Sequence, residues 1–369
     1  MRLRASGPAH VRLTLRSGPQ DRVLKDGNQS KCAIFSPRLG TKQTELASGT
    51  HTTVKPDIAV SLAQAQAIVD RLGDVQTVAQ VSELHGGDIG AIYEIGLVDG
   101  APSLVLKVYP ESLHWKMRKE VNVCTLLSGR LSTAVPRILL ADDAKSLIGL
   151  NFVLMSKLDG AVLRTLEPAL ADTELFSAYS QMGEVLREIH GISMQSFGYI
   201  GHDGVWTPHA SNRAYMSFQF DKKLTEFAGR GGDPPLGDRL AAVVRERAYL
   251  LDACPTAHLC HYDFHSGNIL AEGSGGSLRL SGVLDFEGAI AGDPLMDIAK
   301  ALYYFAAKDE PKKAGLLAGY GAIERGDWQE TLGLYRLYGT LELWCWMAQI
   351  GNHEPLARLA EDLRISTRC

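Results

Sequence analysis

Short alternating apolar segments dominate the first part of the chain, from residue 56 to residue 158, and predict a β-rich unit. Five segments are strand candidates: 75–84, 91–97, 103–109, 138–140 and 149–155. Apolar residues at helical spacing predict two helices beside them, over 61–72 and 112–127. Ser61 is a suitable N-cap for the first helix, and Gly73 is a suitable stop.

After residue 159 the apolar spacing becomes helical and predicts a second, mostly helical unit that runs to residue 369. Its expected helices cover about 175–190, 211–228, 236–252, 294–307, 327–350 and 354–364. Between the third and fourth of these, two short strands and a turn at 273–276 predict a hairpin.

Residues 1–55 have no sustained periodicity and hold ten Lys and Arg against three Asp and Glu. We interpret them as a disordered or loosely attached basic extension without a catalytic part. The remaining residues hold 28 basic against 39 acidic side chains. This acidic charge favours a cationic substrate and disfavours nucleic acid, although an ordinary acidic protein surface explains it equally well.

The composition is that of a soluble globular protein, with 45% hydrophobic and 22% charged residues among 369. No apolar run reaches membrane-spanning length, and the first residues have no signal-peptide core. Six scattered cysteines without a Cys-x-x-Cys pair favour neither a disulfide framework nor a zinc site. We therefore expect a cytoplasmic protein without membrane association, as a monomer or a homodimer.

The chemistry is concentrated in residues 259–270, where Asp263 is followed five positions later by Asn268. A second aspartate, Asp285, ends the apolar run 280–284. An acid that accepts a hydroxyl proton, together with an amide and a carboxylate that bind metal, is the set that phosphoryl transfer requires. The spacing His261-x-Asp263-x-x-x-x-Asn268 matches the catalytic loop of the protein-kinase superfamily.

Three segments together resemble the aminoglycoside phosphotransferase family, the small-molecule branch of the protein-kinase-like fold. They read CHYDFHSGNIL at 260–270, VLDFE at 283–287 and AGDPLMDIA at 291–299. The resemblance implies an α+β, bilobal fold, with a small antiparallel β-sheet lobe near 56–158 and a larger helical lobe near 159–369. It also implies Mg²⁺-dependent transfer of the γ-phosphate of ATP or GTP to a hydroxyl of a small molecule.

The resemblance assigns roles to the residues of the catalytic loop. Asp263 is the expected base, and Asn268 and Asp285 are the expected Mg²⁺ ligands. His261 is expected to be buried and to brace the loop. His265 is expected either to contact the γ-phosphate or to make a structural hydrogen bond.

Lys107 lies within an otherwise apolar strand candidate, where an unpaired ammonium would be costly to bury. In the kinase superfamily this lysine binds the α- and β-phosphates and is held by a glutamate of the next helix. Glu120, thirteen residues later, is the expected partner, and the alternative is a solvent-facing Glu120 beside Lys116 or Lys119.

Two further segments are expected to contact the nucleotide. Gly86, Gly87 and Gly90 would allow backbone N–H groups to approach the phosphates, although a tight turn without a ligand is the alternative. By position in the family, the backbone of Ser156 and Leu158 would bind the adenine edge.

The residues around the acceptor are less well defined. The role of Glu287 stays undecided: it either contacts substrate or metal or only lies near them. We expect Asp293 to cap a helix and brace the catalytic loop, and Asp297 to be structural. Four acidic residues, Glu324, Asp327, Glu330 and Glu342, are candidates to meet amino groups, with helix-surface solvation as the alternative.

The acceptor itself stays open between an aminoglycoside-type antibiotic and a metabolic sugar or amino alcohol, because one fold serves many substrates. A nucleotide-binding pseudokinase is the competing class. It is disfavoured because Lys107, Asp263, Asn268 and Asp285 are all present.

Overall fold

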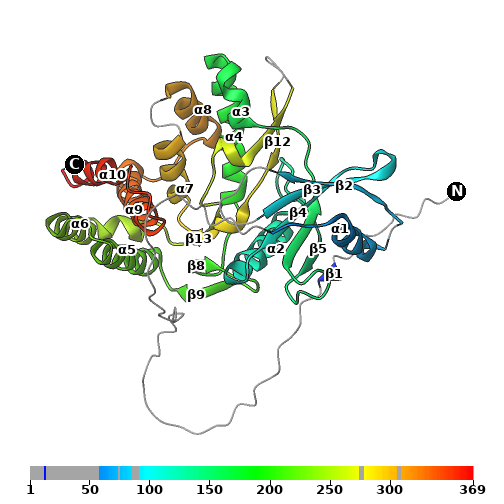
Figure 1. The fold of residues 1–369 in the computed structure, drawn as a ribbon. Helices are drawn as coiled ribbons and strands as arrows, with labels where there is room; N and C mark the ends of the chain where they lie inside the picture. The colour runs from blue at the N-terminus through cyan, green and yellow to red at the C-terminus, as the bar shows by residue number, and fades with distance from the viewer. Residues whose placement is uncertain are drawn as a thin grey trace, which may run out of the picture.

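The computed structural model describes residues 12–13, 58–73, 75–84, 91–273, 278–305 and 309–368. They form a sheet-rich N-lobe and a larger, mainly helical C-lobe, which lie beside each other in Figure 1. The expected α+β bilobal architecture is therefore confirmed. The division of the chain at residue 158 stays a prediction.

A six-stranded sheet forms the N-lobe, in the order β1-β5-β6-β4-β3-β2. Its main strands are β2 (Val78–Leu84), β3 (Ala91–Leu97), β4 (Leu104–Tyr109), β5 (Ile138–Asp142) and β6 (Asn151–Ser156). They pair in an antiparallel manner, as expected. From the basic extension, Arg12–Leu13 forms β1, which pairs in parallel with β5.

Two helices accompany this sheet. In α1 (Leu62–Val69), Ser61 and Gln64 form a reciprocal capping box, and Gly73 takes a positive φ of 86° after the last turn, so both predicted ends are confirmed. The second helix, α2 (His114–Leu127), buries Met117, Val123 and Cys124 in the large core that continues into the C-lobe. It therefore connects the two lobes.

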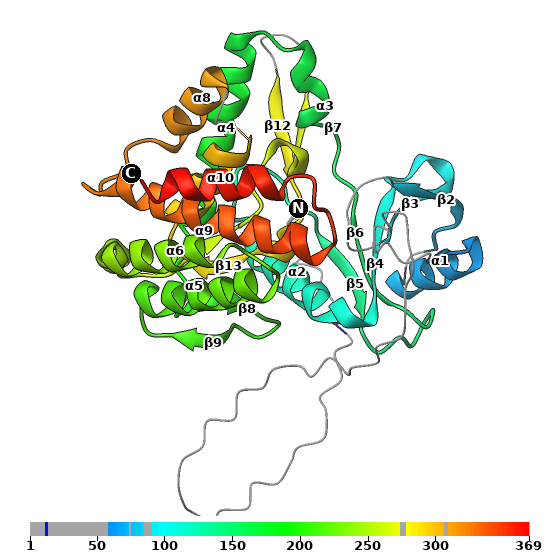
Figure 2. The ribbon, with the colours of Figure 1, turned by 60° about the vertical axis from the view of Figure 1, so that its left-hand side comes forward.

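Helices make up most of the C-lobe. The longer ones are α4 (Asp172–His190), α5 (Asn212–Gly229), α6 (Pro234–Glu246), α8 (Glu310–Tyr320), α9 (Trp328–Gln349) and α10 (Leu356–Ser366). Figure 2 shows α5, α6, α9 and α10 stacked against one another. Helices α4 and α8 approach closely because Gly183 and Gly319 place no side chain at their contact.

Two small sheets hold the catalytic segment between them. The first has the order β10-β13-β8-β9, and the second has the order β12-β11-β7. Their strands are β7 (Ala161–Val162), β8 (Phe197–Ile200), β9 (Val205–His209), β10 (His258–Cys260), β11 (Ile269–Glu272), β12 (Arg279–Val283) and β13 (Ile290–Gly292). The loop 261–268 thus leaves one sheet at β10 and enters the other at β11.

The C-lobe differs from the expectation in several places. The helix expected over 236–252 ends at Glu246, and a 3₁₀ segment, Ala248–Ala253, follows it. The helix expected over 294–307 is the short α7 (Leu295–Lys300), followed by a π-helical turn over Ala301–Phe305. The pattern also missed the short helix α3 (Leu163–Leu166), the β8–β9 pair and α8. None of the helices in the described ranges is long and apolar enough to cross a bilayer.

Candidate active site

The catalytic loop has an unusual backbone conformation at Tyr262, whose φ is 64°. A non-glycine residue in this region costs about 1–3 kcal/mol, so the surroundings must stabilise it. Asp297 of α7 does so, because its two carboxylate oxygens accept hydrogen bonds from the backbone N–H groups of His261 (2.7 Å) and Tyr262 (2.6 Å). His190 of α4 lies 3.0 Å from the same carboxylate.

This arrangement corrects the expectation for Asp293. Asp293 accepts from the backbone N–H of Leu295 at the start of α7, which confirms the cap, but its other oxygen accepts from Arg325 and Tyr335. The side chain that braces the loop is instead Asp297, one helical turn further along the chain. Asp297 reaches the backbone of His261 and Tyr262 because α7 packs against the catalytic loop.

His261 is fully buried and braces the loop, as expected. Its Nε2 donates to the carbonyl of Leu284 (3.0 Å), and its Nδ1 accepts from the backbone N–H of Asp263 (3.3 Å). Burial lowers the pKa of the imidazole. A neutral histidine therefore connects the residue before Asp285 to Asp263.

Asp263 lies at the open side of the loop, with 42% of its side chain exposed. The amide nitrogen of Asn268 donates to the Asp263 backbone carbonyl (2.9 Å) and to its Oδ2 (3.3 Å). Partial burial opposes ionisation, but the hydrogen bond from His265 and the charge of Lys300 together lower the pKa of Asp263 well below its usual value. The expected base is therefore ionised at neutral pH.

Lys107 of β4 reaches three carboxylates across the two lobes. Its Nζ lies 3.1 Å from Glu120, 3.0 Å from Asp285 and 3.1 Å from Glu287. Burial opposes the charge, but the carboxylates of Asp285 and Glu120 raise the pKa of Lys107 well above its usual value. The expected pair of Lys107 and Glu120 is confirmed, and the alternative of a solvent-facing Glu120 is wrong, because Glu120 is buried.

The neighbouring lysines of α2 contact the C-lobe. Lys116 pairs with Glu287 (3.1 Å), and Lys119 donates to the backbone carbonyl of Ala289 (3.0 Å). Glu287, whose role the sequence left undecided, therefore bridges two lysines of the N-lobe, Lys107 and Lys116. These contacts hold the metal-motif segment against α2.

The two expected metal ligands lie beside each other, because the backbone carbonyl of Asn268 accepts from the N–H of Leu284 (2.8 Å), the residue before Asp285. Asn268 turns its amide nitrogen toward Asp263, so its amide oxygen faces the other way. Around them, the carboxylates of Asp285, Glu120 and Glu287 outnumber the two lysines. Hard oxygen donors with excess negative charge fit Mg²⁺.

Comparison with known proteins agrees with this geometry. The model of a family described as the phosphotransferase enzyme family matches residues 80–334. The chain belongs to this family. It is therefore a phosphotransferase with an alcohol group as acceptor, and the family resemblance found in the sequence is confirmed.

Solved aminoglycoside phosphotransferases share the fold. A structure of APH(4)-Ia is 18% identical, with a TM-score of 0.62, over 84% of this chain and 99% of that chain. The GDP and kanamycin complex of APH(2")-IIia is 16% identical, with a TM-score of 0.60, over 84% and 99%. A ternary complex of an APH(4)-Ia mutant with AMP-PNP and hygromycin B is 20% identical, with a TM-score of 0.60, over 81% and 97%. No curated protein matches the chain in sequence.

Some expected nucleotide contacts of the phosphotransferase stay predictions. Gly86, Gly87 and Gly90 lie outside the described residues, between β2 and β3. Ser156 ends β6, and the side chain of Leu158 packs near Gly282 of β12. The hinge segment thus lies close to the strand that leads to Asp285, where an adenine contact is expected.

Sequence reasoning missed two side chains that the phosphotransferase fold brings to the loop. Arg164 of α3 lies 2.6 Å from Nδ1 of His265. Lys300, at the end of α7, donates to the backbone carbonyl of Tyr262 (2.6 Å) and lies over the Tyr262 ring. Neither position belongs to a local motif, so no signal in the sequence could have indicated them.

Proposed function

We propose that the protein transfers the γ-phosphate of ATP or GTP, bound with Mg²⁺, to a hydroxyl of a small cationic molecule. The observation that carries this proposal is the convergence of Asp263, Asn268 and Asp285 with the lysine pair Lys107–Glu120 at the junction of the lobes.

Each residue has one role in this reaction. Lys107, held by Glu120, would bind the α- and β-phosphates, and Asn268 and Asp285 would hold Mg²⁺. The metal would offset the negative charge of the phosphates. Asp263, ionised and exposed, would orient the acceptor hydroxyl and accept its proton.

The cationic acceptor is supported by Glu342 of α9. Its Oε2 accepts from the hydroxyl of Tyr262 (2.8 Å), the neighbour of Asp263 in the catalytic loop. Across the described ranges, no Lys, Arg or His forms an ion pair with this half-buried carboxylate, so it is available to an amino group. Kanamycin and hygromycin B in the complexes of structural neighbours support an aminoglycoside-type substrate.

A metabolic sugar or amino alcohol is the alternative acceptor. The test is a phosphorylation screen with ATP and GTP against aminoglycosides, amino alcohols and neutral sugars, with product detection by mass spectrometry. Turnover confined to neutral sugars would contradict the cationic acceptor. Nucleotide binding without transfer to any acceptor would favour a pseudokinase.

The role of Asp263 is tested by Asp263→Asn. Loss of the proton acceptor should lower kcat about 10²–10⁴-fold, with little change in nucleotide affinity, because the phosphate-binding residues remain. Asp221→Asn, on the exposed face of α5, is the matched control. Unchanged turnover in Asp263→Asn would remove this residue from the mechanism.

A further inference from the structure

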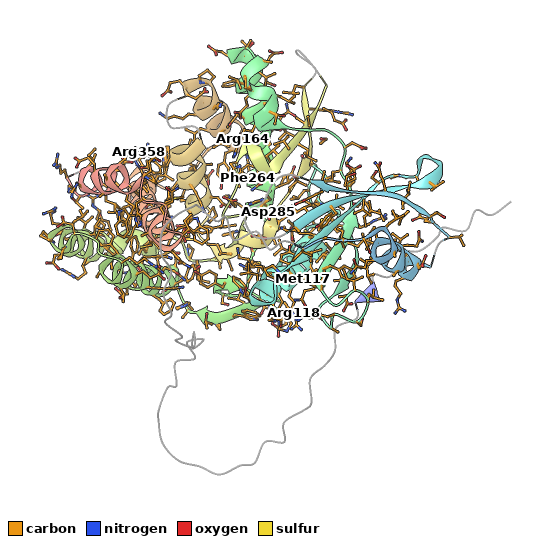
Figure 3. The ribbon with its side chains drawn as sticks, in the orientation of Figure 1. Met117, Arg118, Arg164, Phe264, Asp285 and Arg358 are labelled. Carbon is orange, nitrogen blue, oxygen red and sulfur yellow. The ribbon has the colours of Figure 1, made fainter. Side chains whose placement is uncertain are left out.

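Arg164 is an exposed residue of α3 that contacts the catalytic loop 101 positions away in the sequence. Figure 3 shows it just above Phe264, on the side of the loop that faces α3. Its place is determined by β7, because Ala161 and Val162 pair with Ala271 and Leu270 of β11. The strand that follows the catalytic loop therefore holds α3 over that loop.

The contact determines the hydrogen bonding of His265. The Nδ1 atom of His265 lies 2.6 Å from Nη2 of Arg164 and 2.9 Å from the backbone nitrogen of Gly267. A guanidinium and a backbone N–H can only donate, so Nδ1 must accept. The proton of the imidazole is therefore on Nε2, which lies 3.5 Å from Oδ2 of Asp263. The Nδ2 atom of Asn268 also lies 3.5 Å from Nε2, but it donates its two protons to the carbonyl and the carboxylate of Asp263.

Gly267 makes this arrangement possible. A Cβ atom at position 267 would lie 2.7 Å from Cζ and Nη2 of Arg164 and 2.7 Å from Cε1 of His265. Real Cβ atoms do not approach other atoms so closely, so any side chain here would push Arg164 or His265 away. The loop is thus built to admit the guanidinium.

We infer that Arg164 is a positioning residue for phosphoryl transfer. It fixes the ring and the tautomer of His265, so that Nε2–H points toward Asp263 and can only donate on the reacting side. This inference rests on the proposed function of Asp263 as the base.

The first test is Arg164→Met, which keeps an unbranched, flexible side chain but removes the guanidinium donors. We expect kcat to fall about 10-fold or more, because small displacements of catalytic groups have effects of this order, while KM for the nucleotide stays unchanged. Arg164→Lys, or added guanidinium ion with Arg164→Met, should restore part of kcat. A kcat equal to that of the wild type would overturn the inference.

The second test needs no activity, so it separates this inference from the proposed function. The ¹⁵N NMR signals of His265, assigned by comparison with His265→Gln, should show Nδ1 unprotonated and Nε2 protonated in the wild type. Arg164→Met should shift these signals toward a mixture of tautomers. A proton on Nδ1 in the wild type, or identical signals in Arg164→Met, would contradict the inference even if phosphoryl transfer were established.

The third test uses Gly267→Ala, whose methyl group should push Arg164 or His265 aside and so break their contact without changing either residue. If both substitutions act through the same contact, the double variant should lose no more activity than the more damaging single variant. Multiplied losses would show that Arg164 and Gly267 act separately and would overturn the inference.

Discussion

Asp297→Ala should destabilise the protein strongly, because it removes a buried carboxylate that accepts three hydrogen bonds. Two of them come from the backbone N–H groups of His261 and Tyr262, and the third comes from His190. Hydrogen bonds to charged groups contribute about 1.5–3 kcal/mol each, and they are not additive at one site. We therefore expect a loss of about 3–5 kcal/mol in the free energy of unfolding.

Thermal unfolding measures this loss. For a chain of this size, 1 kcal/mol corresponds to about 1.5 °C, so Tm should fall by roughly 5–8 °C. Asp221→Ala, on the exposed face of α5, is the control and should change stability by no more than about 0.5 kcal/mol. If Asp297→Ala shifted Tm no more than this control, Asp297 would not stabilise the strained loop.

Three further predictions concern charge at the lobe junction. Lys107→Met should raise KM for the nucleotide and lower Tm, because it leaves three carboxylates without their shared cation. The control is Lys313→Met, at a lysine whose side chain is 44% exposed, and equal effects of the two substitutions would refute this role of Lys107. Burial and the charge of Lys116 lower the pKa of Lys119 from 10.5 to about 8, so the protonated lysine destabilises the folded state below pH 8, and this penalty disappears as the pH rises to 10.5. The free energy of unfolding of Lys119→Met should therefore exceed that of the wild type by most at pH 7, and this difference should disappear by pH 10. A difference in denaturant unfolding that does not depend on pH would contradict the lowered pKa. Removal of divalent cations with EDTA should abolish transfer, and Mg²⁺ should restore it, whereas full activity in EDTA would exclude a metal-dependent reaction.

The sequence predicted the parts of the fold that depend on local patterns. Ser61 and Gly73 marked the ends of the first helical segment, and the alternation over 91–97 and 103–109 indicated neighbouring strands. Lys107 and Glu120 could be paired because a strand followed by a helix places them at a known spacing. Their separation of thirteen residues is short enough for one supersecondary unit to determine the contact.

Contacts between distant segments could not be predicted in this way. Which of Asp293 and Asp297 braces the catalytic loop depends on how α7 packs against that loop. The two aspartates are only four residues apart, and the sequence does not determine this packing. The β8–β9 pair and α3 are too short to show periodicity. Arg164 reaches His265 only because β7 joins the sheet of β11.

The catalytic loop begins on one sheet and ends on another, at β10 and β11. An added or deleted residue within 261–268 would either displace Asp263 and Asn268 from each other or shift one of these strands along its sheet. A slip of one position would turn every side chain of that strand to the opposite face. The length of this loop is therefore constrained from both of its ends.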